Sequence, residues 1–175
     1  MPTVHILPLK YPDHVSLEMV ADALAQELAW PTVIDRFTFD PTYAYDEGRQ
    51  QFNSTQLLLG LRSRVLEPND KILAVVSFDL FIPILTFVFG EAQLEGPAAV
   101  VSNFRLRPEF YGLPANPHLV LERLIKESIH EIGHTFGLYH CQNSGCVLNA
   151  STYAEEVDLK TRHFCISCSS ALKAK

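Results

Sequence analysis

The apolar and polar positions of the first half of the chain change repeatedly between strand-like and helix-like periods. An apolar run at 3–9 predicts a buried strand, and leucine, valine and alanine then recur at helical spacing over 16–29. Ser16 is available as the N-cap of that helix. A second strand is predicted over 31–39, so the chain begins with a strand, a helix and a strand.

The middle of the chain predicts one further helix and three further strands. Residues 40–48 contain Pro, Asp and Gly without a period and predict a loop. A helix is expected after Asn53, which has Gln56 three residues on, and its pattern continues to residue 66. Strands are then predicted over 71–78, 86–92 and 97–106.

The second half of the chain contains one long helical pattern. Asn116 and Pro117 have the character of an N-cap and a first helical residue, and the pattern continues to residue 136, a length of about 30 Å. After Gly137 the pattern fades into an irregular tail. We therefore expect an α/β (α+β) fold in which helices pack on a twisted mixed sheet of four or five strands.

Composition and charge restrict the possible partners. Of the 175 residues, 47% are hydrophobic and 19% charged, which is typical of a globular chain, and the net charge is −6. No cluster of Lys and Arg interleaved with aromatic residues suggests nucleic acid, and the longest apolar run, 78–89, is broken by Asp79 and Pro83. We expect no nucleic acid, membrane or protein partner. Because no secretory signal is evident, we expect a cytoplasmic location.

The segment HEIGHTFGLYH at 130–140 has the spacing of a metal site. His130 and His134 are four residues apart on the predicted helix, so their side chains lie on one face and can share a cation. Gly137 tolerates the left-handed conformation that ends a helix, and the redirected chain can return His140 as a third ligand. Three neutral imidazoles leave a fourth zinc position open, which is typical of a catalytic site.

Glu131 completes a hydrolytic centre at this site. Its side chain lies about 100° around the helix from His130, near enough to reach a zinc-bound water without binding the metal. Zinc lowers the pKa of that water, and Glu131 can accept its proton as general base and pass it to the leaving amine. The expected function is a zinc-dependent peptidase that acts on a peptide or protein.

The motif is also compatible with coincidence, with lost activity and with a different substrate. At the frequencies of His, Glu and Gly in this chain, the full pattern would arise by chance in about one such chain in thirty thousand. Ligands can persist after activity is lost, so an inactive two-zinc module that binds peptides is an alternative. Zinc-dependent hydrolysis of a non-peptide amide is another.

All four cysteines lie in the last fifth of the chain. They form two short pairs, with four residues between Cys141 and Cys146 and two between Cys165 and Cys168. This spacing predicts a closed, structural zinc site with four thiolate ligands, and two disulfides or free thiols are the alternatives. We therefore expect two Zn²⁺ per chain. Because Cys141 follows His140 directly, the second zinc would also hold the segment that delivers the third histidine.

The segment HEIGHTFGLYHC, with the QNSGC and CISC that follow, resembles the archaemetzincins, a branch of the metzincin zinc metallopeptidases with an additional four-cysteine zinc site. RQQFNST at 49–55 and FVFGEA at 87–92 are also similar to stretches of that family. The resemblance implies a metzincin-like zincin fold with a backing helix and an active-site helix. It implies a single catalytic domain over 1–175, with sheet and helices in 1–137 and a zinc-stabilised C-terminal subdomain in 138–175.

Two further expectations come from this resemblance. The first is that the strand edging the cleft, to which a peptide substrate could add, is formed by Phe87, Val88, Phe89, Gly90 and Glu91. The second concerns the methionine that metzincins carry in a tight turn beneath the catalytic zinc. At that position the chain has Leu148, which supplies an apolar floor of nearly the same volume without the thioether.

Overall fold

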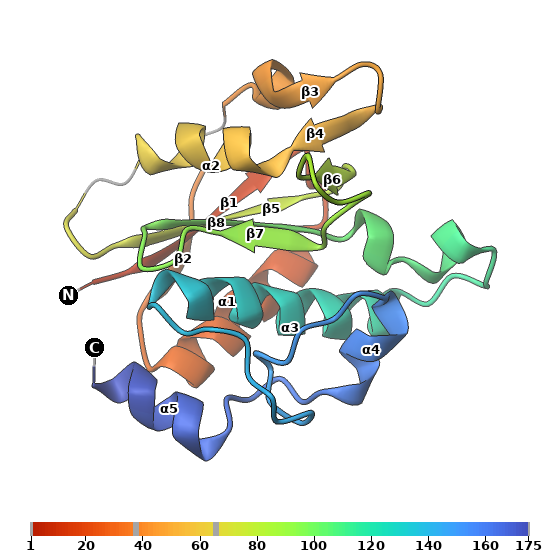
Figure 1. The fold of residues 1–175 in the computed structure, drawn as a ribbon. Helices are drawn as coiled ribbons and strands as arrows, with labels where there is room; N and C mark the ends of the chain where they lie inside the picture. The colour runs from red at the N-terminus through yellow and green to blue at the C-terminus, as the bar shows by residue number, and fades with distance from the viewer. Residues whose placement is uncertain (1, 37–38, 65–66, 175) are drawn as a thin grey trace.

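The computed structural model describes residues 2–36, 39–64 and 67–174. A five-stranded sheet in the order β2-β1-β5-β8-β7 forms its centre (Figure 1). Strand β7 runs antiparallel to β8, and the other neighbouring strands are parallel. The expected mixed sheet with packed helices is therefore confirmed. The strands of this sheet are β1 (Val4–Leu9), β2 (Thr32–Ile34), β5 (Lys71–Val76), β7 (Gly90–Ala92) and β8 (Ala98–Ser102).

Helices cover both faces of the sheet. Helices α1 (His14–Leu28) and α3 (Pro117–Thr135) lie on one face, and α2 (Ser54–Arg62) lies on the other (Figure 1). Along β5, Leu73 and Val75 belong to the apolar cluster under α1 and α3, whereas Ala74 and Val76 belong to the cluster under α2. Because both faces are buried, the strand is continuously apolar in sequence.

The region between β2 and β5 contains more structure than its sequence indicates. A 3₁₀ helix at Pro41–Ala44 and strand β3 (Tyr45–Asp46) occupy most of the predicted loop. Strand β3 pairs with β4 (Gln51–Asn53), and β4 pairs with β6 (Leu80–Phe81), which gives a small second sheet. These strands are too short to produce a period in the sequence.

The helix starts are set by side-chain caps. Asn53 accepts a hydrogen bond from Gln56 N at 3.1 Å and Asn116 accepts one from Leu119 N at 3.1 Å, so both predicted caps are confirmed. The Ser16 cap is wrong, because Asp13 caps α1 by accepting from Ser16 N at 3.1 Å. The predicted end of the second helix, at 65–66, lies outside the described residues.

All five predicted strands are longer than the observed ones, and the difference is largest at three of them. Strand β2 ends at Ile34, and residues 37–38 lie outside the described residues. Strand β8 ends at Ser102, whose hydroxyl donates to Phe78 O at 2.6 Å and accepts from Phe104 N at 3.0 Å, which turns the chain into a 3₁₀ helix. The strand predicted over 86–92 is regular only at Gly90–Ala92.

The tail after α3 contains two helices, α4 (Ala154–Leu159) and α5 (Ile166–Lys173), which the sequence pattern did not predict. They lie on the side of α3 that faces away from the sheet (Figure 1). Every helix in the described ranges is too short or too polar to span a lipid bilayer.

The central position of β5 generates a stability prediction. Leu73→Ala removes a side chain that is 0% exposed and is expected to lower the free energy of unfolding by about 2–5 kcal/mol, because it leaves a cavity in the core. Leu59→Ala on α2 is the matched control, since that leucine is 56% exposed, and it should change the value by less than about 0.5 kcal/mol. Urea unfolding measures both, and equal losses would contradict this description of the core.

Candidate metal centre

Helix α3 presents two histidines one turn apart, and each is oriented by a backbone carbonyl. Nδ1 of His130 donates to Val147 O at 2.8 Å, and Nδ1 of His134 donates to Leu138 O at 2.6 Å. These bonds place the hydrogen of each neutral ring on Nδ1 and leave Nε2 as the acceptor. The two Nε2 atoms lie 3.0 Å apart.

His140 reaches the same place because the chain reverses after α3. Gly137 has a φ of 80°, in the left-handed region, and its N–H donates to His134 O at 2.8 Å. The His140 ring centre then lies 5.2 Å from that of His130 and 4.9 Å from that of His134. One ligand atom from each of the three residues lies within 4.8 Å of the others, so the structure brings the three predicted ligands together.

The electrostatic surroundings keep these imidazoles neutral. His130 is 5% exposed, and burial lowers its pKa well below the usual value, with the nearby Lys160 ammonium acting in the same direction. Burial also lowers the pKa of His134 and of His140. A neutral imidazole is the form that binds a metal ion.

The histidine cluster fits a zinc ion. Two nitrogen ligands at 2.0–2.1 Å from a tetrahedral zinc lie about 3.3 Å from each other, close to the 3.0 Å between the Nε2 atoms of His130 and His134. Both Nδ1–H groups are bonded to carbonyls, the arrangement by which proteins orient ligand histidines.

Glu131 lies against an edge of the sheet. Its side chain is 6% exposed, and burial raises the pKa of its carboxyl group well above the usual value, with the Glu127 carboxylate adding to the effect. A Cβ atom on Gly90 would lie 2.7 Å from both Cγ and Oε1 of Glu131. The absence of a side chain at Gly90 therefore allows β7 and Glu131 to approach closely.

A cavity of about 500 Å³ opens beside the histidines. Residues 85–90 line one side of it, residues 150–153 line another, and α3 contributes Glu127, His130 and Glu131. His140 also lines it. This volume lies in the range of sites that bind small molecules or single side chains of a larger ligand.

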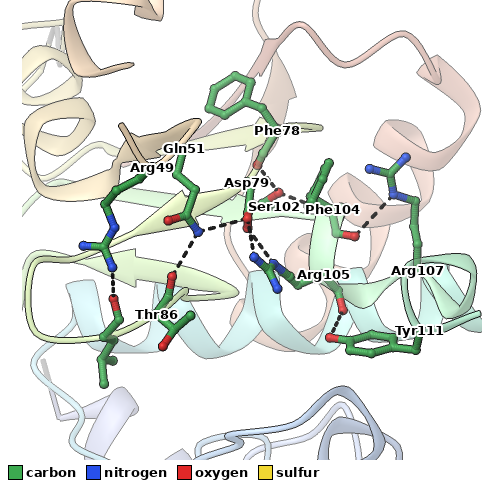
Figure 2. A network of polar contacts seen from close by, with 11 residues as sticks. Arg49, Gln51, Phe78, Asp79, Thr86, Ser102, Phe104, Arg105, Arg107 and Tyr111 are labelled. Atoms are coloured by element: carbon green, nitrogen blue, oxygen red, sulfur yellow. Dashed lines mark hydrogen bonds and ion pairs between the residues drawn. The ribbon is translucent and has the colours of Figure 1, made fainter. Parts of the chain in front are cut away.

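The cavity wall at residues 85–88 is held from behind by a polar network (Figure 2). Arg49 Nη2 donates to Leu85 O at 2.9 Å, and Gln51 Nε2 donates to Thr86 O at 3.0 Å. The same Gln51 nitrogen donates to Asp79 Oδ2 at 2.9 Å. Side chains from β4 and its neighbours thus fix two consecutive carbonyl groups of the wall.

Asp79 also anchors the next residue of the wall. Arg105 Nε donates to Asp79 Oδ1 at 2.9 Å and Arg105 Nη2 donates to Oδ2 at 2.5 Å, as Figure 2 shows. The guanidinium group then lies 4.6 Å from the ring centre of Phe87 and 4.3 Å from that of Phe110. The wall is therefore positioned by an ion pair and by a cation–π contact with Phe87.

The edge strand is shorter than expected. Of the residues assigned to it, Gly90 and Glu91 lie in β7, which is the edge strand of the five-stranded sheet. Phe87, Val88 and Phe89 also line the cavity, but they precede the regular strand, and the segment turns toward the small sheet at Val88. Val88 N donates to Leu80 O at 2.9 Å, and pairing with β8 resumes at Phe89 O, which accepts from Ser102 N at 2.8 Å.

The four cysteines form a second cluster. The Sγ atoms of Cys141, Cys146, Cys165 and Cys168 all lie within 4.8 Å of one another, and none is in a disulfide. Cys141 Sγ lies 3.8 Å from Cys165 Sγ, and two thiolates at 2.3 Å from a tetrahedral zinc are about 3.8 Å apart. The backbone N–H of Cys168 helps to lower the pKa of Cys165 to about 7. The cluster therefore also fits zinc.

A tight turn at residues 146–149 lies next to both clusters. Cys141 N donates to Leu148 O at 2.9 Å, and Asn149 Nδ2 donates to Cys141 O at 2.8 Å. Leu148 is fully buried, and its Cδ2 lies 3.0 Å from the position of a Cβ atom on Gly133, between the two helical histidines. The leucine thus forms an apolar floor under this part of α3.

Two charged residues beside the histidines were missed by sequence reasoning. Glu127 lies one helical turn before Glu131, which was a usable signal, and it forms an ion pair with Lys160 at 2.8 Å. Lys160 is 3% exposed, although nothing in its local sequence distinguishes it from a surface lysine.

Comparisons with known proteins found similar sequences and structures. Residues 42–174 match the model of peptidase family M54. The archaemetzincin of Methanocaldococcus jannaschii is 48% identical over 128 residues, which cover 73% of this chain and 69% of that protein. The archaemetzincin of Archaeoglobus fulgidus is 35% identical over 170 residues, which cover 97% and 98%.

Solved structures extend the similarity to the whole fold. A zinc-dependent peptidase from Methanocorpusculum labreanum superposes with a TM-score of 0.88 at 31% identity, covering 97% of this chain and 99% of that one. The structure of archaemetzincin from Archaeoglobus fulgidus complexed with malonate gives a TM-score of 0.81 at 35% identity, with the same coverage.

The approach of Gly90 to Glu131 generates a prediction. Gly90→Ala is expected to lower the free energy of unfolding by about 1–3 kcal/mol, because the new Cβ atom meets Glu131 and also lies 2.7 Å from Val100 O. Gly48→Ala is the matched control, since its Cβ atom would have its nearest neighbour at 3.4 Å. Denaturant unfolding of both variants tests the contact. A Gly90→Ala protein with the same free energy of unfolding as the wild type would contradict it.

Proposed function

Since the chain belongs to peptidase family M54, and is therefore a zinc metallopeptidase, we propose that it hydrolyses peptide bonds with Glu131 as general base and three histidine ligands. The observation that carries this proposal is the convergence of three neutral imidazoles beside a buried carboxyl group in one cavity. His130, His134 and His140 would hold the catalytic zinc.

The ion supplies Lewis acidity toward a peptide carbonyl and toward water. Glu131 accepts a proton from the attacking water at a carboxylate oxygen, as the water oxygen bonds to the peptide carbon. The same carboxyl group then donates that proton to the amide nitrogen, and the carbon–nitrogen bond breaks. The buried position of Glu131 against Gly90 keeps its carboxyl group directed at the cavity.

The edge strand β7 offers a place for the substrate backbone. Phe89 O accepts from Ser102 N and Gln93 N donates to Ala98 O, so by the register of the pair every second residue, 89, 91 and 93, faces β8. In an antiparallel pair the intervening residue, here Gly90, directs its backbone groups away from that neighbour. An extended peptide would pair with this edge and cross the cavity past Glu131.

A second zinc would be held by the four thiolates and would be structural. This ion stabilises the C-terminal subdomain, residues 138–175, within a single catalytic domain over 1–175. Because Cys141 adjoins His140, the structural ion also fixes the position of the third catalytic ligand. Leu148 takes the position of the metzincin methionine under the zinc-binding helix.

Substitution of Glu131 tests the general base. Glu131→Gln keeps the size of the side chain but cannot accept the proton, so kcat/KM for a peptide substrate is expected to fall by about 10²–10⁴-fold. Peptide hydrolysis and metal content are measured on the same preparation. The variant should retain two zinc ions per chain. Equal hydrolysis by wild type and variant would contradict the assignment, and peptide binding without turnover by either would favour a binding module.

Removal of one thiolate tests the coupling of the two sites. Cys165→Ser is expected to reduce the zinc content from two ions to one and to lower activity by roughly 10–100-fold, although all three histidines remain, because His140 loses its anchor. Metal analysis and peptide hydrolysis check this together. Full activity with a single bound zinc would show that the cysteine site does not support the histidine site.

A further inference from the structure

A lysine is buried directly behind the histidine cluster. Lys160 follows the last residue of α4 and is 3% exposed, whereas lysine side chains normally keep their ammonium group in water. A buried ammonium group has to donate its three hydrogens to nearby acceptors. The groups that surround this ammonium group indicate what Lys160 does.

The first partner is a carboxylate on α3, which forms an ion pair with the ammonium group. Lys160 Nζ lies 2.8 Å from Glu127 Oε1, and the two side chains are 1% and 5% exposed. Glu127 lies three residues before His130 and one turn before Glu131 on the same helix. This ion pair therefore fixes the ammonium group relative to the part of α3 that carries the motif.

The second partner is a backbone carbonyl in the turn beneath that helix, and it accepts a hydrogen bond. Lys160 Nζ donates to Asn149 O at 3.0 Å. Asn149 in turn donates from Nδ2 to Cys141 O at 2.8 Å, and Cys141 is bonded to His140 in the chain. A continuous line of contacts thus runs from Glu127 to the junction of the two clusters.

The ammonium group also lies 3.4 Å from Nδ1 of His130. That nitrogen donates to Val147 O, whereas Lys160 donates to Asn149 O, two residues further along the same turn. The turn, residues 146–149, is therefore fixed at Val147 by His130 and at Asn149 by Lys160.

We propose that Lys160 is a positioning residue that holds the turn 146–149 against α3 and so sets the places of His130 and His140 around the metal ion. The proposal rests on the proposed function only in taking the three histidines as zinc ligands. Lys160 itself is not among the residues that line the cavity. An apolar side chain of similar size could fill its space but could not donate to Asn149 O.

A second ion pair, between a buried arginine and an exposed aspartate, provides a control. Arg123 donates from Nε and Nη2 to Asp158 at 2.8 and 2.6 Å. Arg123 lies on α3 one turn before Glu127, and Asp158 lies two residues before Lys160, so this pair joins the same two segments. Its arginine donates further to Leu106 O, away from the turn 146–149.

The test measures the zinc affinity of the histidine site by competition with a chromogenic chelator. Because the chelator can remove zinc from both clusters, the His140→Ala variant identifies which of the two zinc ions is released from the histidine site. Lys160→Met is made in a Glu127→Gln background and compared with Glu127→Gln alone, so that no unpaired carboxylate remains. We expect the added Lys160→Met change to weaken zinc binding and to lower kcat, each by roughly 10–100-fold. The Arg123→Met/Asp158→Asn control should lower the melting temperature but leave zinc affinity and kcat at wild-type values.

Two results would overturn the proposal. One is unchanged zinc affinity when Lys160→Met is added to Glu127→Gln, and the other is an equal loss of affinity in the Arg123→Met/Asp158→Asn control. If the double variant does not fold, Asn149→Ala is used instead, because it removes the hydrogen bond from Asn149 to Cys141 O. A wild-type zinc affinity in that variant would also overturn the proposal. A wild-type protein without peptidase activity would contradict the proposed function alone, because zinc affinity does not depend on turnover.

Discussion

His130 donates its Nδ1 hydrogen to Val147 O at 2.8 Å, and this bond joins the helix that carries the motif to the turn that follows it. It directs Nε2 toward His134 and draws the turn under α3, with Leu148 as the apolar floor. The two ends of the turn then serve different purposes. Cys146 belongs to the thiol cluster, and Asn149 bonds to Cys141, the neighbour of His140.

The rest of the fold supplies rigid surroundings for this bond. Helix α3 packs on a sheet whose central strand β5 is buried on both faces, so the histidines project from a fixed element. The opposite wall of the cavity lacks a regular strand at residues 85–88 and is held by Gln51, Asp79 and Arg105. Side-chain hydrogen bonds and an ion pair thus hold this part of the wall in place, where regular strand pairing is absent.

Much of this arrangement could be predicted from the sequence, because it depends on local patterns. The spacing of His130 and His134, the cap at Asn116 and the reversal at Gly137 each have a local cause, and the structure contains all three. The parts that were missed depend on distant partners. Lys160 differs from a surface lysine only through its contacts in space, and Val88 leaves the edge strand because it pairs with Leu80.

We infer that two metal sites meet at the peptide bond between His140 and Cys141. Anomalous diffraction at the zinc absorption edge, from crystals of the zinc-loaded protein, tests this inference most directly. We expect two peaks per chain, one about 2.0–2.1 Å from nitrogens of His130, His134 and His140, and one about 2.3 Å from the four sulfurs. A single peak, or a peak at the helical histidines without His140 among its ligands, would contradict it.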